Sequence, residues 1–272
     1  MTALAEIYGQ SFMRDALCAA VLSGAMLAYL GLFIVLRRTV FLGAALPQLA
    51  ALGAAGAMVA GIPPTGGALA GTILGVAALS LVSPRGRVPA DGAVGVAFAL
   101  ASSATLLILA RSAQGETHVL QILSGDILGT TQVEIFWMAG IFGATALLHY
   151  ACWKEFLFVS YDPDMAATLG LRIRFWDGLL FFSLAACVAL ALRVSGAIVS
   201  FAFLIGPSVA ALLVSRRFPV IIATAIILGA LSAAAGLTLS FFEDLPSGPT
   251  IAACSLVPIL PAMLGRWFVR EA

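Results

Sequence analysis

Few side chains in this 272-residue sequence have the chemistry to bind a cation, and the clearest pair is a carboxylate near an imidazole. Glu116 and His118 stand two residues apart in the polar stretch QGETHVLQ. A carboxylate oxygen and an imidazole nitrogen both ligate divalent transition metals. We therefore consider Glu116 and His118 a candidate entry site for a metal ion, with an ordinary solvated loop as the alternative.

The remaining polar side chains lie near the ends of apolar runs. His149 stands among aromatic residues, where aromatic packing at a membrane interface is the first interpretation and an exit-side metal ligand is the alternative. Glu134 and Asp177 are expected to face water, and Arg193 to snorkel or to face a pathway. None of the 13 acidic residues lies clearly in the middle of an apolar run. This argues against a proton-coupled carrier, and the two histidines offer no constellation for an intramembrane enzyme.

The composition places these residues in a polytopic membrane protein. Hydrophobic residues make up 62% of the chain and charged residues 10%, whereas soluble domains carry about 25% charged residues. A membrane-spanning helix needs about 20 apolar residues. We predict one all-α membrane domain over 1–272, a bundle of eight or nine transmembrane helices. The candidate spans are 16–36, 44–62, 66–82, 92–110, 133–152, 175–192, 196–214, 219–240 and 249–268.

The basic residues set an orientation for these spans. Eleven of the 14 lysines and arginines fall in five clusters that can all face the cytoplasm, which puts the N-terminus outside and the C-terminus inside. The loops between the spans are too short to bury a core of their own. The sequence also lacks a GxxxxGK[ST] phosphate-binding motif. Any ATPase domain must therefore be a separate chain, and a net charge of +1 gives no reason to expect a nucleic-acid partner.

One inner-face segment, YDPDMAATLGLR at 161–172, interrupts the apolar sequence. Asp162 is a good N-cap, Pro163 fits the first helical turn, and Gly170 stops the helix. We predict a short amphipathic helix at about 162–172. An ordinary interfacial helix and a docking element for a soluble cytoplasmic partner are both open interpretations. Its predicted apolar face consists of Met165, Ala166 and Leu169.

Five segments, in order along the chain, resemble the membrane permeases of zinc/manganese-type ABC importers. In that wider class of importers a Glu-Ala-Ala-x-x-x-Gly helix couples the permease to its ATPase, and Asp164, Met165, Ala166 and Gly170 match this spacing. The segments are LGLFIVLRRTVFLGAAL (30–46), LSGDILG (123–129), FVSYDPDMAATLGL (158–171), SGAIVSFAFLIGPSVAALLVSRR (195–217) and FEDLPSGPTIAACS (242–255).

The resemblance implies the permease subunit of a binding-protein-dependent importer in the bacterial inner membrane, with zinc or manganese as cargo. It implies a homodimer that forms the pathway, cytoplasmic ATPase subunits that bind ATP and Mg²⁺, and an extracytoplasmic solute-binding protein. This chain would need no cofactor and would hydrolyse no ATP. The residues implied to couple to the ATPase are Asp162, Pro163, Asp164, Met165, Ala166, Leu169, Gly170 and Arg172.

The chain departs from the family at the expected metal site. The family reads roughly Gly-Asp-Ala-x-Ser-His at the start of the second span, so that an Asp and a His lie on one helix face. The matching positions here are Ala44, which has no ligating atom, and Gln48, which offers an amide. Three explanations remain open. The ion passes with little side-chain ligation, other residues have taken over, or the cargo is a metal chelate or small organic solute.

Overall fold

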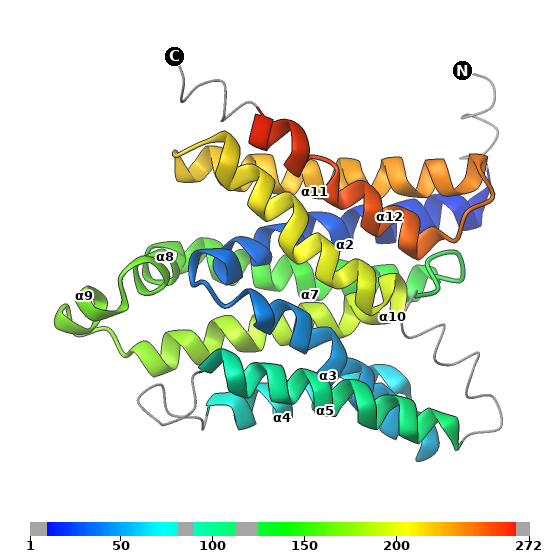
Figure 1. Cartoon of the computed structure of the whole chain (residues 1–272), viewed down its shortest axis with the longest axis horizontal. Coiled ribbons are helices and arrows are strands. Elements are labelled where there is room, and N and C mark those ends of the chain that lie inside the picture. Colours follow the sequence, from blue (N-terminus) through cyan, green and yellow to red (C-terminus); the bar gives the residue numbers. More distant parts are fainter. Residues whose placement is uncertain (1–9, 81–89, 112–124, 265–272) are drawn as a thin grey trace. The chain divides into compact units, whose positions relative to one another are not determined.

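The computed structural model describes residues 10–80, 90–111 and 125–264, and the regular structure in these ranges is helical. Figure 1 shows the helices in sequence colours. They are α2 (Ser11–Leu36), α3 (Val40–Val59), α4 (Pro64–Ser80), α5 (Ala90–Ala110), α7 (Gln132–Ala151), α8 (Trp153–Tyr161), α9 (Pro163–Thr168), α10 (Ile173–Val214), α11 (Phe218–Phe242) and α12 (Ser247–Leu256).

The prediction of an all-α polytopic bundle is confirmed. Within the described residues, seven helical segments are long and apolar enough to cross a membrane, and a shorter apolar helix covers Pro64–Leu79. The 42-residue α10 contains two of the predicted spans, and its backbone leaves the helical region at Gly196 (φ 78°, ψ 171°). At about 1.5 Å per residue α10 is about twice as long as the hydrocarbon layer is thick. The described part of each of the nine predicted spans therefore lies largely in helix.

Helix α8 is the element that the sequence reading missed. Only Cys152 separates it from α7, and it buries Phe156, Val159 and Ser160. Lys154 and Glu155 lower the hydropathy at this point. The apolar pattern therefore predicts a span that ends at 152 and no helix after it. The next helix, α9, covers Pro163–Thr168 and is shorter than the predicted range of about 162–172.

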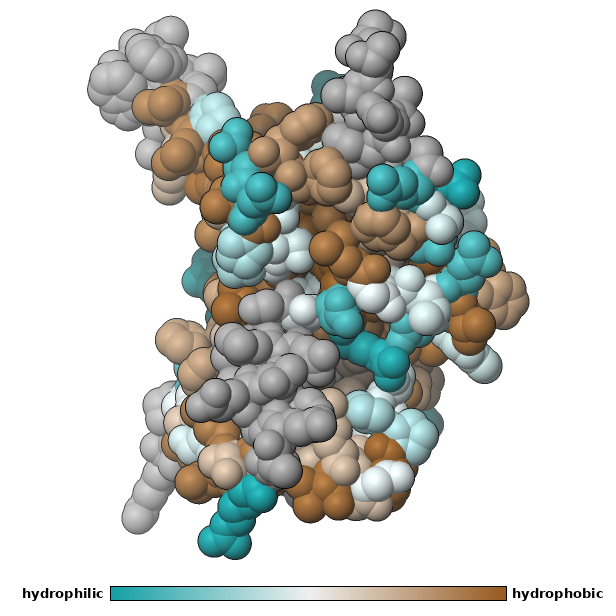
Figure 2. Space-filling model, turned by 90° about the vertical axis from the view of Figure 1, so that its right-hand side faces the viewer, coloured by the Kyte–Doolittle hydropathy of each residue, from teal (hydrophilic) through white to brown (hydrophobic). Residues whose placement is uncertain are grey.

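The chain divides into two compact units. Unit 1 combines the described residues of 1–32, 120–139 and 191–272, and unit 2 those of 33–119 and 140–190. The boundaries pass through α2, α7 and α10, so each of these helices contributes to both units. Figure 2 views the right-hand side of Figure 1 and shows hydrophilic residues scattered among hydrophobic ones.

In unit 1, α2 approaches α10 and α11 so closely that only glycine fits. A Cβ on Gly24 would lie 2.5 Å from the carbonyl oxygen of Gly229 in α11. A Cβ on Gly31 would overlap the carbonyl oxygen of Leu204 in α10 and lie 2.6 Å from Ser208 Oγ. Small residues that let helix backbones touch are the usual means of packing in membranes, where burial of apolar surface gives little driving force.

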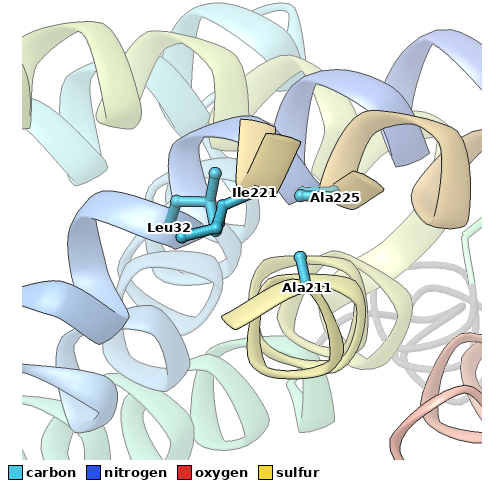
Figure 3. Packing of buried hydrophobic residues seen from close by; sticks show 5 residues of the cluster. Leu32, Ala211, Ile221 and Ala225 are labelled. Carbon is cyan, nitrogen blue, oxygen red and sulfur yellow. The ribbon is translucent and has the colours of Figure 1, made fainter. Parts of the chain in front are cut away.

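A small apolar cluster continues this contact toward the end of α2. Figure 3 shows its residues pointing toward one another from α2, α10 and α11. Beside the cluster, the Ser208 hydroxyl donates a buried hydrogen bond of 2.8 Å to the carbonyl oxygen of Ala28. The buried members of the cluster are Ala28, Leu32, Ala211, Ile221 and Ala225.

In unit 2, polar groups join α7 to α10 across the helix interface. His149 Nε2 lies 2.9 Å from Ser183 Oγ, and Cys187 Sγ donates to Thr145 Oγ1 at 3.5 Å. The His149 ring also stacks on Phe156, with ring centroids 4.4 Å apart. His149 thus packs against aromatic rings, as expected, but it is 1% exposed and lies in the core of unit 2 rather than at an exposed interface.

Candidate functional site

The N-terminus of α9 is built as the sequence predicts. Asp162 Oδ1 accepts a hydrogen bond of 2.9 Å from the Met165 N–H, and Pro163 occupies the first turn. The side chain satisfies one of the N–H groups that a helix start leaves without a partner, and proline has none to lose. Asp162 and Pro163 together fix where this short helix begins.

Gly170 ends α9 in a left-handed conformation with φ 83°. The Leu171 N–H donates to the Ala166 carbonyl oxygen at 3.1 Å, and the Gly170 N–H donates to that of Ala167 at 3.0 Å. This pair of bonds is a Schellman motif, in which a left-handed residue turns the chain sharply away from the helix axis. A Cβ at Gly170 would meet no atom within 4 Å, so the glycine is required by the backbone rather than by packing.

Helix α9 stands out from the rest of unit 2. In 161–170 only Ala166 is buried, while the side chains of Met165 and Leu169 are 53% and 64% exposed. Asp164 and Arg172 are exposed as well. Figure 1 shows α9 at the far left, beyond α8 and the first turns of α10. The predicted apolar face therefore presents two large side chains outward and packs on its own chain only through Ala166.

Arg37, the residue after α2, contacts the elements on both sides of α9. Its Nε donates to Ser160 Oγ near the end of α8 at 3.0 Å, and its Nη1 donates to Asp177 Oδ1 near the start of α10 at 2.6 Å. Asp177, which is expected to face water, is 33% exposed, and its carboxylate in addition forms this ion pair. The two partners of Arg37 are 123 and 140 residues away in sequence, a separation that no local pattern reveals.

A second ion pair lies in unit 1, between Arg193 and Glu134. Glu134 Oε2 also accepts hydrogen bonds from the Thr131 N–H (2.9 Å) and hydroxyl (3.0 Å), at the start of α7. Thr-x-x-Glu is the capping-box pattern, a signal in the sequence that could have assigned Glu134 to a helix N-terminus. Glu134, which is expected to face water, is partly exposed and in addition caps the start of α7 and pairs with Arg193.

The two residues at the family's metal-site positions share an accessible stripe of α3. From 42 to 55, every residue of α3 is buried except Ala44, Gln48, Leu52 and Gly53. The first three follow one another at four-residue intervals and so lie on one helix face. The rest of α3 packs against α4 and α5. Gln48 is the only residue among these four with a polar side chain, and its amide is neutral.

The described residues contain no group of three or more His, Cys, Asp or Glu side chains that could hold a metal ion. The candidate entry site of Glu116 and His118 lies outside the described residues. Ala44 and Gln48 are therefore the predicted cargo-pathway positions that can be placed in the described residues, on the partly accessible stripe of α3.

The whole chain resembles proteins of metal import systems. The sequence model of the ABC 3 transport family matches residues 9–266. A probable iron transport system membrane protein of Haemophilus influenzae is 29% identical over 96% of this chain and 92% of its own length. The manganese transport system membrane protein MntC of Listeria monocytogenes is 30% identical over 93% of this chain and 90% of its own.

The fold has a counterpart among solved structures. The structure described as PsaBC from Streptococcus pneumoniae in complex with Fab superposes with a TM-score of 0.87 and 23% sequence identity. The alignment covers 96% of this chain and 95% of that chain. At this identity the likeness concerns the fold alone.

Proposed function

Because this chain belongs to the ABC 3 transport family, we propose that it is the permease of a metal importer driven by separate ATPase subunits. Its apolar helices and its relatives make it a multi-pass protein of the bacterial inner membrane. Two copies of the chain form the pathway, and an external binding protein delivers the cargo. The chain supplies the path and a mechanical connection, and a partner chain binds ATP and Mg²⁺.

The observation that carries this proposal is the construction of α9. A short helix with an N-cap at Asp162 and a glycine stop at Gly170 projects from unit 2 with only Ala166 buried. Such a helix gains little stability from its own packing. The exposed Met165 and Leu169 side chains are large apolar groups of the kind that fill a pocket on a partner protein. Docking in a groove of the ATPase explains both features.

Co-purification tests the proposal. The full-length chain is expressed with its binding protein and candidate ATPase, extracted in mild detergent and purified by a tag on this chain. We expect an ATPase with a P-loop to elute in equal amount. We also expect proteoliposomes of the complex to take up metal only when ATP is present on the side of the membrane where the ATPase lies. A chain that purifies without an ATPase, or that transports without ATP, would contradict the proposal.

The relatives are named for the metals that they transport, and these names guide the proposal for the cargo. The relatives include the manganese transport system membrane protein MntC of Listeria monocytogenes and the chelated iron transport system membrane protein YfeC of Yersinia pestis. We propose a manganese- or iron-type cargo for this chain. The α3 stripe favours a second possibility for its form, because Ala44 and Gln48 present no carboxylate or imidazole to strip water from a bare ion. A metal chelate needs only neutral hydrogen bonds of the kind that Gln48 offers.

The cargo assignment leads to the first prediction. In the variant Ala44→Asp with Gln48→His, a carboxylate and an imidazole would lie one helical turn apart, about 5–6 Å between Cβ atoms. We expect this variant to bind free Mn²⁺ or Zn²⁺ and to shift the ratio of free-ion to chelate uptake toward the free ion by about tenfold or more, or about 1.4 kcal/mol. Radiolabelled uptake in proteoliposomes with each cargo form measures the ratio.

The matched control is Ala44→Asn with Gln48 unchanged, which adds the volume of the aspartate without charge or imidazole and should leave the ratio near that of the wild type. If the Asp/His variant keeps the wild-type ratio and binds no metal, the α3 stripe does not line the path.

A further inference from the structure

The chain on both sides of α9 converges on one guanidinium. Ser160 precedes the N-cap of α9 by two residues, and Asp177 follows Gly170 by seven. Arg37 donates to Ser160 Oγ from Nε and to Asp177 Oδ1 from Nη1. Because α9 itself buries only Ala166 in 161–170, its position relative to unit 2 depends on how these two flanking segments are held.

Arginine suits this place for geometric reasons. The guanidinium carries its donors in a rigid planar fork, so Nε and Nη1 can serve two acceptors at a fixed angle. Its carbon Cζ also lies 5.5 Å from the ring centroid of Phe181, within the range of a cation–π contact. The Arg37 side chain is only 11% exposed, and a charge so nearly buried is stable only when it is paired. A single point charge on a flexible stem cannot hold both acceptors in the same way.

The backbone beside Arg37 is held in an unfavourable conformation. Arg38 has φ 58°, and the Thr39 N–H donates to the Ile34 carbonyl oxygen at 3.1 Å, which ends α2 in a Schellman motif with an arginine where glycine is usual. Non-glycine residues stay in this conformation only where the surroundings determine it. The side-chain contacts of Arg37 and the hydrogen bond from the Thr39 hydroxyl to the Ile34 carbonyl oxygen lie directly beside this turn.

An aromatic contact ties the same two flanks together. The rings of Phe156 in α8 and Trp176 in α10 meet edge to face with centroids 5.5 Å apart, and Phe33, in the last turn of α2, contacts the Phe156 ring from the other side. Ser160 also donates to the Phe156 carbonyl oxygen at 2.6 Å. A polar and an aromatic contact thus connect the end of α2, α8 and the start of α10. Helix α9 lies in the segment between α8 and α10.

We propose that Arg37 is a positioning residue that fixes both flanks of α9 to the end of α2, so that a displacement of α9 by the ATPase moves α2 instead of only bending the flanks. This inference rests on the proposed docking of α9. It adds that Arg37 carries much of the force that leaves the docking helix, beside the aromatic contact between Phe156 and Trp176. Without that arginine the helix can still dock, but less of its movement is transmitted.

The test uses the complete complex with its ATPase in proteoliposomes and measures the number of metal ions transported per ATP hydrolysed. For Arg37→Met we expect unchanged co-purification of the ATPase, continued ATP hydrolysis, and a fall of about tenfold in metal transported per ATP, within the range of known coupling factors. Arg37→Lys keeps the charge but not the planar fork of donors, so its ratio of metal transported per ATP should lie between those of the wild type and Arg37→Met. Asp177→Leu, which keeps the approximate size but removes the acceptor of the Arg37 hydrogen bond, is used if Arg37→Met does not fold, and the same fall is expected.

The matched control is Arg38→Met, which removes the neighbouring exposed arginine and should leave the ratio unchanged. The inference is overturned if Arg37→Met or, where that variant does not fold, Asp177→Leu transports with the wild-type ratio, or if Arg38→Met causes an equal loss. A wild-type complex that contains no ATPase contradicts the proposed function itself, and the inference with it. If the wild type and the Arg37 variants transport the same amount of metal per ATP, only the inference is contradicted.

Discussion

Replacing Gly170 by valine is expected to separate ATP hydrolysis from transport while the helical bundle stays folded. Valine is strongly disfavoured at φ 83°, so the Schellman motif that ends α9 would be lost and the helix would point in a different direction. The added side chain meets no atom within 4 Å in the chain itself, so the cost to folding should be limited to about 1–2 kcal/mol of backbone strain. We expect transport per ATP to fall by about 5- to 150-fold, the usual range of coupling between sites.

Gly61 provides a closely matched control for this experiment. It ends α3 with the same pair of hydrogen bonds, from Ile62 N–H to the Ala57 carbonyl oxygen and from Gly61 N–H to that of Met58. Its φ is 70°, and a Cβ there also meets no atom within 4 Å. Gly61→Val should therefore cost similar stability and leave transport per ATP unchanged. Equal loss of coupling in both variants, or in neither, would show that Gly170 has no special connection to the ATPase.

Replacing Gly31 by valine should have the largest effect on stability. Its Cβ would overlap the backbone of Leu204, which cannot move aside as a flexible side chain can. We expect a loss at or above the upper end of the about 1–3 kcal/mol typical of overpacked cores, a large part of a total stability of about 5–15 kcal/mol. Thermal unfolding in detergent, followed by size-exclusion chromatography, should show a much lower midpoint or no folded protein.

Gly143 in α7 is the control for Gly31. It lies in a helix of similar apolar character, it is exposed, and a Cβ there meets no atom within 4 Å. Gly143→Val should change the unfolding free energy by no more than about 0.5 kcal/mol, as surface substitutions usually do. If Gly31→Val unfolds at the same temperature as Gly143→Val, α2 and α10 do not pack as described.

Much of the fold and the limits of α9 can be predicted from local sequence patterns. Apolar runs of span length identify the helices, because a chain in lipid must satisfy its backbone hydrogen bonds within each segment. Asp162, Pro163 and Gly170 identify the limits of α9 because caps and stops act over only a few residues. The Gly196 kink within α10 appears in the sequence only as a short gap between two predicted spans.

The features that the sequence does not predict depend mostly on contacts between segments that are distant in sequence. The side chain of Arg37 could be assigned to the inner face by the basic-residue rule, but not to Ser160 and Asp177, which come close only in the folded chain. Helix α8 was hidden because its charged first turn resembles the end of a span, while its buried residues are spaced for a helix. Glu134 was assigned to water although its capping-box partner Thr131 stands three residues before it.

Site-directed cross-linking tests most directly whether α9 is gripped by the ATPase. In a chain whose four cysteines are replaced, Leu169→Cys places a thiol on the exposed face of α9, and Ile62→Cys places one on the turn after α3. In inside-out membrane vesicles containing the whole complex, a short cross-linker that reacts with a thiol at one end and with an amine at the other should join Leu169→Cys to the ATPase and leave Ile62→Cys unlinked. A Leu169→Cys that never links to the ATPase, and that reacts with a membrane-impermeant thiol reagent only in right-side-out vesicles, would contradict this account.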